Sequence, residues 1–514
     1  MSEDEFSRPR HEHLLLLLLF LLFAAASLAA PINHDESQYV GAIAMMREGL
    51  PFRDWPFLQT PLQPLLLSPL SLLPAGWLLV GARLANVLFG VLACWALLRL
   101  FRDRIPFWAA AATTIGMATT NAFLFGTEVA RNDMLPAALL ALSLFAFLPH
   151  GEMPSWRRTG LAGLFLGLAI SAKISMAVPA AGAGLWLLWR FNRVGARAVA
   201  TAALGGLVGL LPSLVLYAMA PERFTFGVFT YSLVAPELYW NGIGESWRLH
   251  PLSKLDDIVA ESLRGATALA LLLTIFTLRS RARQRLFEIM ALGGLVAAYL
   301  PDPFFKQYMI PLLPPLFARA GRALPMLGPL GRRVTLAAGA VFAIVGASGS
   351  LKAIATMAMR EPPLLEAVDR GRIVAAVAAG RPVATLSPEQ IAGADVRLDP
   401  DFTAGPFLFR IQGPTGAMVE AEVGAPTFQR LGDLDRDPPA VLVTGAERRV
   451  RPPLFPHGLD DSLDDWAASR GYRPQPLPGR GWRMWVAPTK RGGPEEPPHY
   501  GQVRTPQGPS RKPA

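Results

Sequence analysis

Long apolar runs dominate the first 350 residues of the chain, and shorter apolar segments between polar stretches follow them. A run of roughly 20 apolar residues can cross the hydrocarbon core of a bilayer as a helix. The segments at 160–172 and 174–190 are short and meet at Lys173, so they could instead form one broken helix. The pattern predicts eleven spans, at 14–31, 77–99, 107–125, 134–149, 160–172, 174–190, 198–219, 264–279, 286–300, 308–320 and 334–350.

After residue 350 the pattern changes to that of a small α/β domain, which we place at 351–487. Residues 383–386 and 441–444 read as short buried strands, 463–469 as a helix and 482–486 as a closing strand. Residues 488–514 are rich in proline, glycine and charge, which favours disorder. We therefore expect a polytopic all-α membrane bundle over 1–350, with interfacial helices in its first outer loop, and a soluble domain after it.

Composition supports a membrane protein. Hydrophobic residues make up 52% of the chain and charged residues 17%, whereas soluble chains carry about 25% charged residues. This excludes a wholly soluble fold and a disordered chain. The single cysteine, Cys94, excludes internal disulfides and cysteine-ligated clusters.

The net charge of +10 would suggest nucleic acid, but the charge follows the loops. Eighteen of the 28 Lys and Arg of residues 1–350 fall in alternate loops. Cytoplasmic loops carry such an excess, so we expect a cytoplasmic N-terminus, an extracytoplasmic 351–514, and no nucleic-acid partner. These residues are Arg8, Arg10, Arg99, Arg102, Arg104, Arg157, Arg158, Arg190, Arg193, Arg197, Arg279, Arg281, Arg283, Arg285, Arg319, Arg322, Arg332 and Arg333.

The first apolar segment has two interpretations. Ser27-Leu28-Ala29 is an acceptable signal-peptide cleavage site. The segment before the run, however, carries four acids against two arginines. We favour an uncleaved first span.

The first outer loop holds an acidic pair, Asp35 and Glu36, directly after the first span. Apolar positions at 39, 40, 43 and 46 predict an amphipathic helix over 37–47 lying on the membrane. Acids at a helix N-terminus are stabilising in themselves, so a capping role is the simpler interpretation. Acids at a span end also mark functional sites.

Other motifs lie at outer span ends. They are Pro61-Leu62-Gln63-Pro64-Leu65, the segment 128–134 (Glu-Val-Ala-Arg-Asn-Asp-Met), Ala172-Lys173, and Lys306-Gln307-Tyr308 entering a proline-rich span. In this order and sidedness, the set resembles the glycosyltransferase C superfamily. It is most similar to the branch that contains protein O-mannosyltransferases, aminoarabinose transferases and rhizobial lipopolysaccharide-core transferases.

The resemblance implies an inner-membrane glycosyltransferase of the cell envelope, with lipopolysaccharide synthesis as one setting. It would move a hexosyl or pentosyl group from a polyprenyl-phosphate donor to a lipid, glycan or protein hydroxyl among membrane lipids. A carboxylate serves as general base, and fixed cations hold the leaving phosphate. The implied catalytic residues are Asp35, Asp133 and Glu36, and the implied substrate-binding residues are Arg131, Lys173, Lys306 and Tyr308. For the cations, snorkelling to the headgroups is the structural alternative.

The sequence departs from the family at one motif. Many members have a lysine and an acidic neighbour where this chain has Gln59 and Thr60. We therefore expect no metal and no cofactor. A transporter or a scaffold for envelope glycolipid is the alternative function, although the acids lie at span ends rather than at the bilayer midplane that transporters use.

Overall fold

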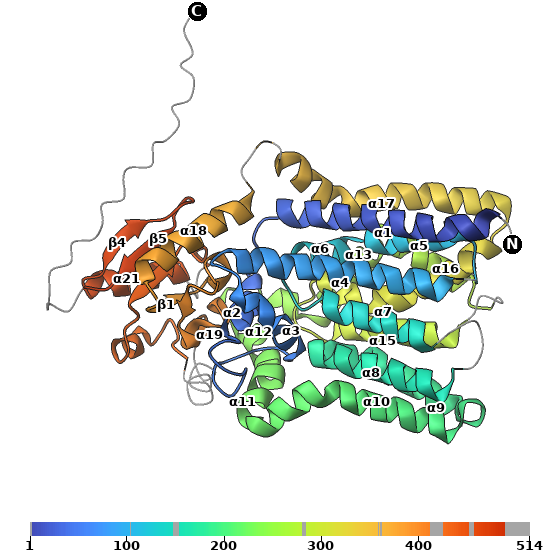
Figure 1. Ribbon diagram of the computed structural model, residues 1–514, viewed down its shortest axis with the longest axis horizontal. Helices are drawn as coiled ribbons and strands as arrows, with labels where there is room; N and C mark the ends of the chain where they lie inside the picture. Colours follow the sequence, from blue (N-terminus) through green and yellow to red (C-terminus); the bar gives the residue numbers. More distant parts are fainter. Residues whose placement is uncertain are drawn as a thin grey trace, which may run out of the picture.

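The computed structural model describes residues 3–102, 104–147, 154–279, 284–357, 359, 362–411, 425–451 and 457–488. Figure 1 shows a bundle of aligned helices with a smaller α/β domain at one end. The N-terminus lies at the opposite end of the bundle from this domain. The α/β part of the chain thus lies at one end of the bundle, and residues of both parts share a hydrophobic cluster there.

Each of the eleven predicted segments contains helix. By length and composition, four described helices can each cross a membrane alone, and a fifth span arises if α13 and α14 are joined across their 93° bend. The other predicted spans are shorter or broken helices, so a count of eleven crossings stays a prediction. The bundle helices are α1 (Glu3–Ala29), α4 (Trp77–Phe101), α5 (Phe107–Ala118), α6 (Asn121–Glu128), α7 (Met134–Phe147), α8 (Trp156–Ala172), α9 (Ala177–Trp189), α10 (Phe191–Met219), α14 (Ala266–Phe276), α15 (Arg285–Tyr299), α16 (Leu313–Ala323) and α17 (Pro329–Met357).

Helix breaks in the bundle place polar residues near the α/β domain. The predicted span 107–125 divides at Thr119 and Thr120 into α5 and α6. Lys173 has extended backbone between α8 and the short helix η2 (Ile174–Met176), so 160–172 and 174–190 form separate helices. A 3-10 helix, η5 (Lys306–Leu312), precedes α16. At these breaks the chain leaves the regular helix, so polar side chains can contact residues outside their own helix.

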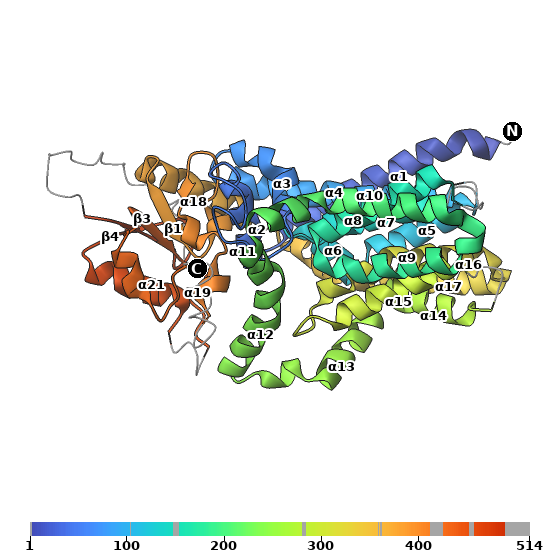
Figure 2. The same ribbon diagram turned by 90° about the horizontal axis from the view of Figure 1, so that it is seen from below.

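Between the bundle and the α/β domain lie the short elements of the outer loops (Figures 1 and 2). Figure 2 shows α12 and α13 extending away from the bundle before the chain returns to it. The elements are α2 (Glu36–Met45), α3 (Leu62–Leu67), η1 (Ser68–Leu72), α11 (Pro221–Thr225), η3 (Phe226–Thr230), α12 (Tyr231–Gly242), η4 (Ser246–Leu249) and α13 (Pro251–Ser262).

The C-terminal domain is built on a five-stranded sheet of order β2-β1-β3-β5-β4. Strands β2, β1 and β3 are parallel, whereas β5 pairs antiparallel with both β3 and β4. The predicted strands and helix are all present. The elements are α18 (Pro363–Ala378), β1 (Pro382–Thr385), η7 (Pro388–Gln390), β2 (Arg397–Leu398), η8 (Pro400–Phe402), α19 (Pro406–Phe409), η9 (Leu431–Asp435), β3 (Val441–Thr444), α21 (Leu459–Ser469), β4 (Arg473–Pro476) and β5 (Arg483–Val486).

The predicted domain boundary at residue 350 falls inside a helix. α17 continues to Met357, and α18 begins the next domain at Pro363. Residues 351–357 favour this extension because they contain neither proline nor glycine. The predicted disordered tail lies outside the described residues except for Pro488.

The expectation that the first outer helix lies on the membrane is wrong. All ten residues of α2 are buried. A Cβ on Gly41 would lie 2.4 Å from the Thr403 carbonyl oxygen and 3.2 Å from the Pro388 ring, both in the C-terminal domain. The apolar face of α2 therefore packs against protein, which the periodicity of the helix could not distinguish from lipid.

Candidate active site

Asp35 and Glu36 lie in very different environments although they are neighbours. Glu36 is fully buried, and its carboxylate accepts hydrogen bonds from Arg83 Nε at 2.8 Å and Nη2 at 2.7 Å. The backbone N–H groups of Asn33 and Ala130 donate to the same carboxylate at 2.7 and 2.6 Å. Glu36 thus has no oxygen left for an acceptor substrate.

Arg83 in α4 ties the end of α1 to this pair. Its guanidinium donates to the carbonyl oxygens of Ser27, Ala30 and Pro31 at 2.7 to 3.0 Å. The last carbonyls of a helix lack partners within the helix, and Arg83 supplies them. The turn that carries Asp35 is therefore fixed relative to the bundle.

The segment between α6 and α7 carries the second carboxylate. Asn86 donates to the carbonyls of Val129 and Arg131 at 2.6 and 2.7 Å, and Gln63 donates to the Arg131 carbonyl at 3.1 Å. Asn132 donates to the Ala172 carbonyl at 3.1 Å. These bonds hold the segment against α3, α4 and the end of α8.

Asp133 is enclosed by two cations. One of its oxygens accepts from Arg131 Nε at 2.9 Å, and the other pairs with the Lys173 ammonium. The Asp133 side chain has no exposed surface. Tyr308 lies beside this group, with its ring centre 5.5 Å from Lys173 Nζ.

Arg131 joins the two aspartates. Its Nη1 forms an ion pair with Asp35 Oδ2 while its Nε binds Asp133. The guanidinium also lies between the rings of Tyr39 and Phe125, at 5.9 and 5.8 Å from their centres. Asp35 keeps 25% of its side chain exposed, so it is the more accessible carboxylate of the two.

Lys306 and Arg131 both lie near the ring of Phe125. Lys306 Nζ is 4.4 Å from the Phe125 ring centre, and it donates to Asn121 Oδ1 at 3.3 Å. In the described part of the chain, no carboxylate forms an ion pair with Lys306 within 4 Å. The structure thus brings all seven residues of the predicted site to one end of the bundle. Of the cations, Arg131 and Lys173 form ion pairs with carboxylates of the site, whereas Lys306 does not.

Sequence reasoning missed Arg83 and His34. Arg83 lies alone inside an apolar run, and such an isolated charge indicates a buried partner. His34 contacts Asp35 Oδ1 through Nε2 at 2.8 Å and the C-terminal domain through Nδ1. No local pattern indicates that contact.

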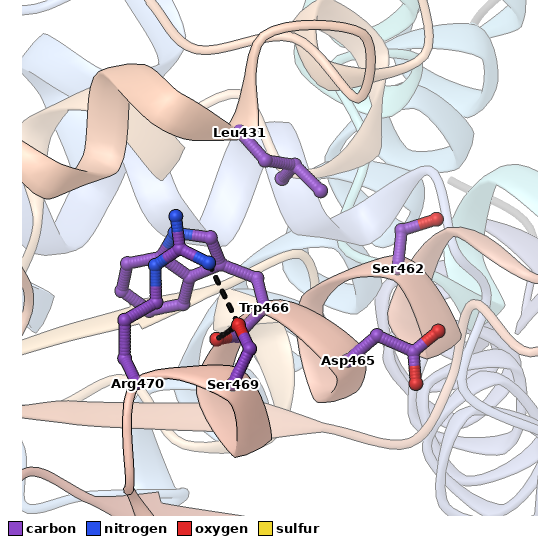
Figure 3. A pocket seen from close by; sticks show the side chains of 6 residues that line it. All are labelled: Leu431, Ser462, Asp465, Trp466, Ser469 and Arg470. Atoms are coloured by element: carbon purple, nitrogen blue, oxygen red, sulfur yellow. Dashed lines mark hydrogen bonds between the residues drawn. The ribbon is translucent and has the colours of Figure 1, made fainter.

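A separate hollow of about 390 Å³ lies on α21 in the C-terminal domain. Figure 3 shows Arg470 over the Trp466 ring, with Ser462, Asp465, Ser469 and Leu431 around the opening. None of the predicted site residues lines it. Within the described ranges, no group of three or more His, Cys, Asp or Glu could hold a metal ion.

Comparisons with known proteins concern the family and the fold of the chain. The family model of glycosyltransferase family 87 matches residues 57–303, just under half of the chain. No curated protein matches the chain in a sequence search.

The crystal structure of ArnT from Cupriavidus metallidurans bound to undecaprenyl phosphate is 16% identical, with a TM-score of 0.60 over 96% of this chain and 100% of that chain. Its apo structure is 16% identical and gives 0.57 over 94% and 99%. The S. cerevisiae protein O-mannosyltransferase Pmt1-Pmt2 complex bound to the sugar donor is 18% identical but gives only 0.32 over 42% and 34%.

The ArnT structures share the fold of both the bundle and the C-terminal domain, since they cover nearly the whole chain. Together with its long apolar helices, this likeness indicates an integral membrane protein with an ArnT-like fold, whose residues 57–303 match glycosyltransferase family 87.

Proposed function

We propose that the protein transfers a hexosyl or pentosyl group from a polyprenyl-phosphate donor to a hydroxyl of a lipid, glycan or protein. The observation that carries the proposal is the partly exposed Asp35 carboxylate, fixed by Arg131 and His34 at the bundle end. The family match and the undecaprenyl phosphate in the ArnT structure support the class of reaction and donor.

In the proposed reaction Asp35 is the general base. The acceptor hydroxyl oxygen bonds to the anomeric carbon while the bond from that carbon to the phosphate oxygen breaks, and the hydroxyl proton passes to Asp35. The bonding electrons leave with the lipid phosphate. A nearby cation stabilises the negative charge that develops there.

We assign the phosphate to Lys306 rather than to Arg131. The sequence predicts both Lys306 and Arg131 as phosphate ligands, yet the Arg131 guanidinium already contacts Asp35 and Asp133. Among the described residues, Lys306 donates one hydrogen bond, a long one of 3.3 Å to a neutral amide. Phe125 contacts both cations, so a phosphate at Lys306 would lie close to the Arg131–Asp35 pair.

Asp133 and Glu36 then have positioning roles. Lys173 and Arg131 occupy the Asp133 oxygens, and Arg83 occupies those of Glu36. Both side chains are fully buried, whereas Asp35 is 25% exposed, so only Asp35 can be reached by a substrate hydroxyl. Tyr308 packs beside Lys173 and can contact the sugar or phosphate.

We also propose an orientation of the protein in the membrane. The site faces outward from the cytoplasmic membrane, with the N-terminus inside and the C-terminal domain outside. The separation of the N-terminus from the C-terminal domain along the bundle supports it, as does the placement of arginines in alternate loops.

The test uses the purified full chain in lipid nanodiscs. A synthetic panel of undecaprenyl-phosphate hexoses and pentoses is incubated with a membrane extract as acceptor source, and released undecaprenyl phosphate is measured. Asp35→Asn should lower the rate roughly 10²–10⁴-fold. Asp54→Asn, the same change in the same loop, should keep the wild-type rate because Asp54 pairs with Arg53 away from this cluster.

Two results would contradict the proposal. One is an active wild-type protein in which Asp35→Asn is as active as Asp54→Asn, which would remove Asp35 as base. The other is a wild-type protein that binds the panel but releases no lipid phosphate, which would favour a transporter or scaffold.

A further inference from the structure

His34 lies between two carboxylates from distant parts of the chain. Its Nε2 is 2.8 Å from Asp35 Oδ1, and its Nδ1 is 3.2 Å from Glu447 Oε1. Neutral imidazole can donate from only one nitrogen, whereas imidazolium donates from both. Only the doubly protonated ring can therefore donate to both of these carboxylates at once.

The backbone fixes Glu447 firmly. It follows β3, and its N–H donates to Asp460 Oδ2 at 2.7 Å. The Gly445 N–H donates to the same oxygen at 2.7 Å, and the Asp460 N–H donates back to the Glu447 carbonyl at 3.1 Å. The carboxylate that faces His34 is thus held between the end of a strand and the start of α21.

The C-terminal domain also contacts the ring of His34, which remains 43% exposed. The Phe407 ring packs against it with centres 5.2 Å apart, and the Phe407 carbonyl accepts from Tyr231 Oη at 2.8 Å. Gly405 has φ +60°, and a Cβ there would lie 2.4 Å from Ser37 Oγ. Only glycine adopts this conformation readily and leaves room for α2. The domain therefore docks closely on the turn that carries His34 and Asp35.

The charged groups around this contact favour an ionised Glu447. Burial raises the pKa of Glu447, but the hydrogen bond and charge of His34 lower it, as do the charges of Arg410 and Arg451, and the pKa lies below its ordinary value. Arg410 stacks on Phe407 at 4.6 Å. On the other side, Asp35 is paired with Arg131. His34 thus faces Asp35 and Glu447, with Arg131, Arg410 and Arg451 beyond them.

We propose that Glu447 of the C-terminal domain is a positioning residue for sugar transfer, which orients the Asp35 carboxylate through His34. The inference rests on the proposed role of Asp35 as base. Held by Arg131 on one oxygen and His34 on the other, Asp35 has a single orientation toward the acceptor. The C-terminal domain would then complete the site instead of merely covering it.

The experiment measures transfer with the same undecaprenyl-phosphate sugar panel and full chain in nanodiscs. Glu447→Ala should lower kcat roughly 10-fold, the size of one charge-assisted hydrogen bond, with KM for the donor unchanged. Glu447→Gln keeps an acceptor oxygen but not the charge. That variant should therefore retain more of kcat than Glu447→Ala, because its side chain can still accept a hydrogen bond from His34.

A double variant tests whether Glu447 acts through His34. If it does, His34→Ala/Glu447→Ala is no slower than His34→Ala alone. Arg397→Ala is the matched control, since Arg397 and Glu48 form another ion pair between the C-terminal domain and the first outer loop, at 3.8 Å and away from Asp35. This control should keep the wild-type kcat and KM.

Three outcomes would overturn the positioning role while the wild-type chain is active. They are a rate for Glu447→Ala within twofold of wild type, losses that multiply in the double variant, and an equal loss in Arg397→Ala. A thermal unfolding midpoint for each variant shows whether it still folds. If Glu447→Ala does not fold, Glu447→Gln, the smaller change, replaces it in the test. If the wild-type chain itself releases no undecaprenyl phosphate, the proposed function fails first and this inference fails with it.

Discussion

Glu36 is buried against Arg83, with both carboxylate oxygens accepting hydrogen bonds from the guanidinium at 2.8 and 2.7 Å. Adjacent residues of a helix do not face the same way, so Asp35 points to a different partner, Arg131. The acidic pair therefore divides into a structural carboxylate and a partly exposed one.

Arg83→Met should destabilise the protein by about 3–5 kcal/mol, because it leaves the Glu36 carboxylate buried without its partner. The measurement is the unfolding midpoint of the full chain in detergent. Glu36→Gln/Arg83→Met should recover part of the loss, since the uncompensated charge is gone. A double variant less stable than Arg83→Met would show that the pair is not coupled.

Lys306→Met should weaken binding of undecaprenyl phosphate by roughly 10- to 100-fold, the worth of a charged hydrogen bond. The fold should persist because Lys306 is only half-buried and forms one long hydrogen bond. Lys352→Met, an exposed lysine in α17, is the control. Equal affinity in the two variants would exclude Lys306 as the phosphate ligand.

Glu389→Gln should flatten the pH dependence of stability. Burial raises the pKa of Glu389 to about 8, and one of its oxygens is buried with no hydrogen-bond partner. The ordinary value in an unfolded chain is about 4.3. Between these values the folded state binds the extra proton, so stability is full below about pH 4 and is lost as the pH rises toward 8.

Unfolding midpoints of the full chain from pH 5 to 9 would check this. Burial also raises the pKa of Asp460 to about 7 and that of Asp399 to about 6, so the variant should retain a weaker slope of the same sign. The variant should be more stable than wild type at pH 9. An unchanged dependence of stability on pH would show that Glu389 is deprotonated in the folded chain as well as in the unfolded chain.

A reporter fused after Ala514 should be active only outside the cytoplasm. The expectation follows from the arginine-rich alternate loops and from the position of the N-terminus at the far end of the bundle. A reporter at Met1 gives the complementary signal. Cytoplasmic activity of the Ala514 fusion would invert the topology and place the candidate site on the inner face.

The helices and strands were predictable because their signals are local. Apolar runs predicted the bundle segments, and Val383 and Val441 fall in strands where the pattern placed them. The environment of α2 was not predictable, since Thr403 and Pro388, which cover Gly41, lie far along the chain. An apolar helix face looks the same whether lipid or protein covers it.

The candidate site was predictable in part. Span-end motifs indicated Asp35, Asp133, Arg131, Lys173 and Lys306, and the structure brings them together. The pairings of these residues were not predictable. A sequence does not show that Arg131 is shared between two carboxylates, or that Lys306 has no carboxylate partner within 4 Å among the described residues. Glu447 carries no motif, and its contact with His34 depends on the docking of a whole domain.

The contact between His34 and Glu447 joins residues 413 positions apart, which has a consequence for biosynthesis. Domains fold in order of emergence as a chain is made, so the turn that holds Asp35 leaves the ribosome long before its distal partner exists. Nascent and prematurely terminated chains, even with every bundle helix inserted, lack Glu447. Only chains whose translation has passed β3 can therefore form the contact between His34 and Glu447. Chains that stall earlier cannot.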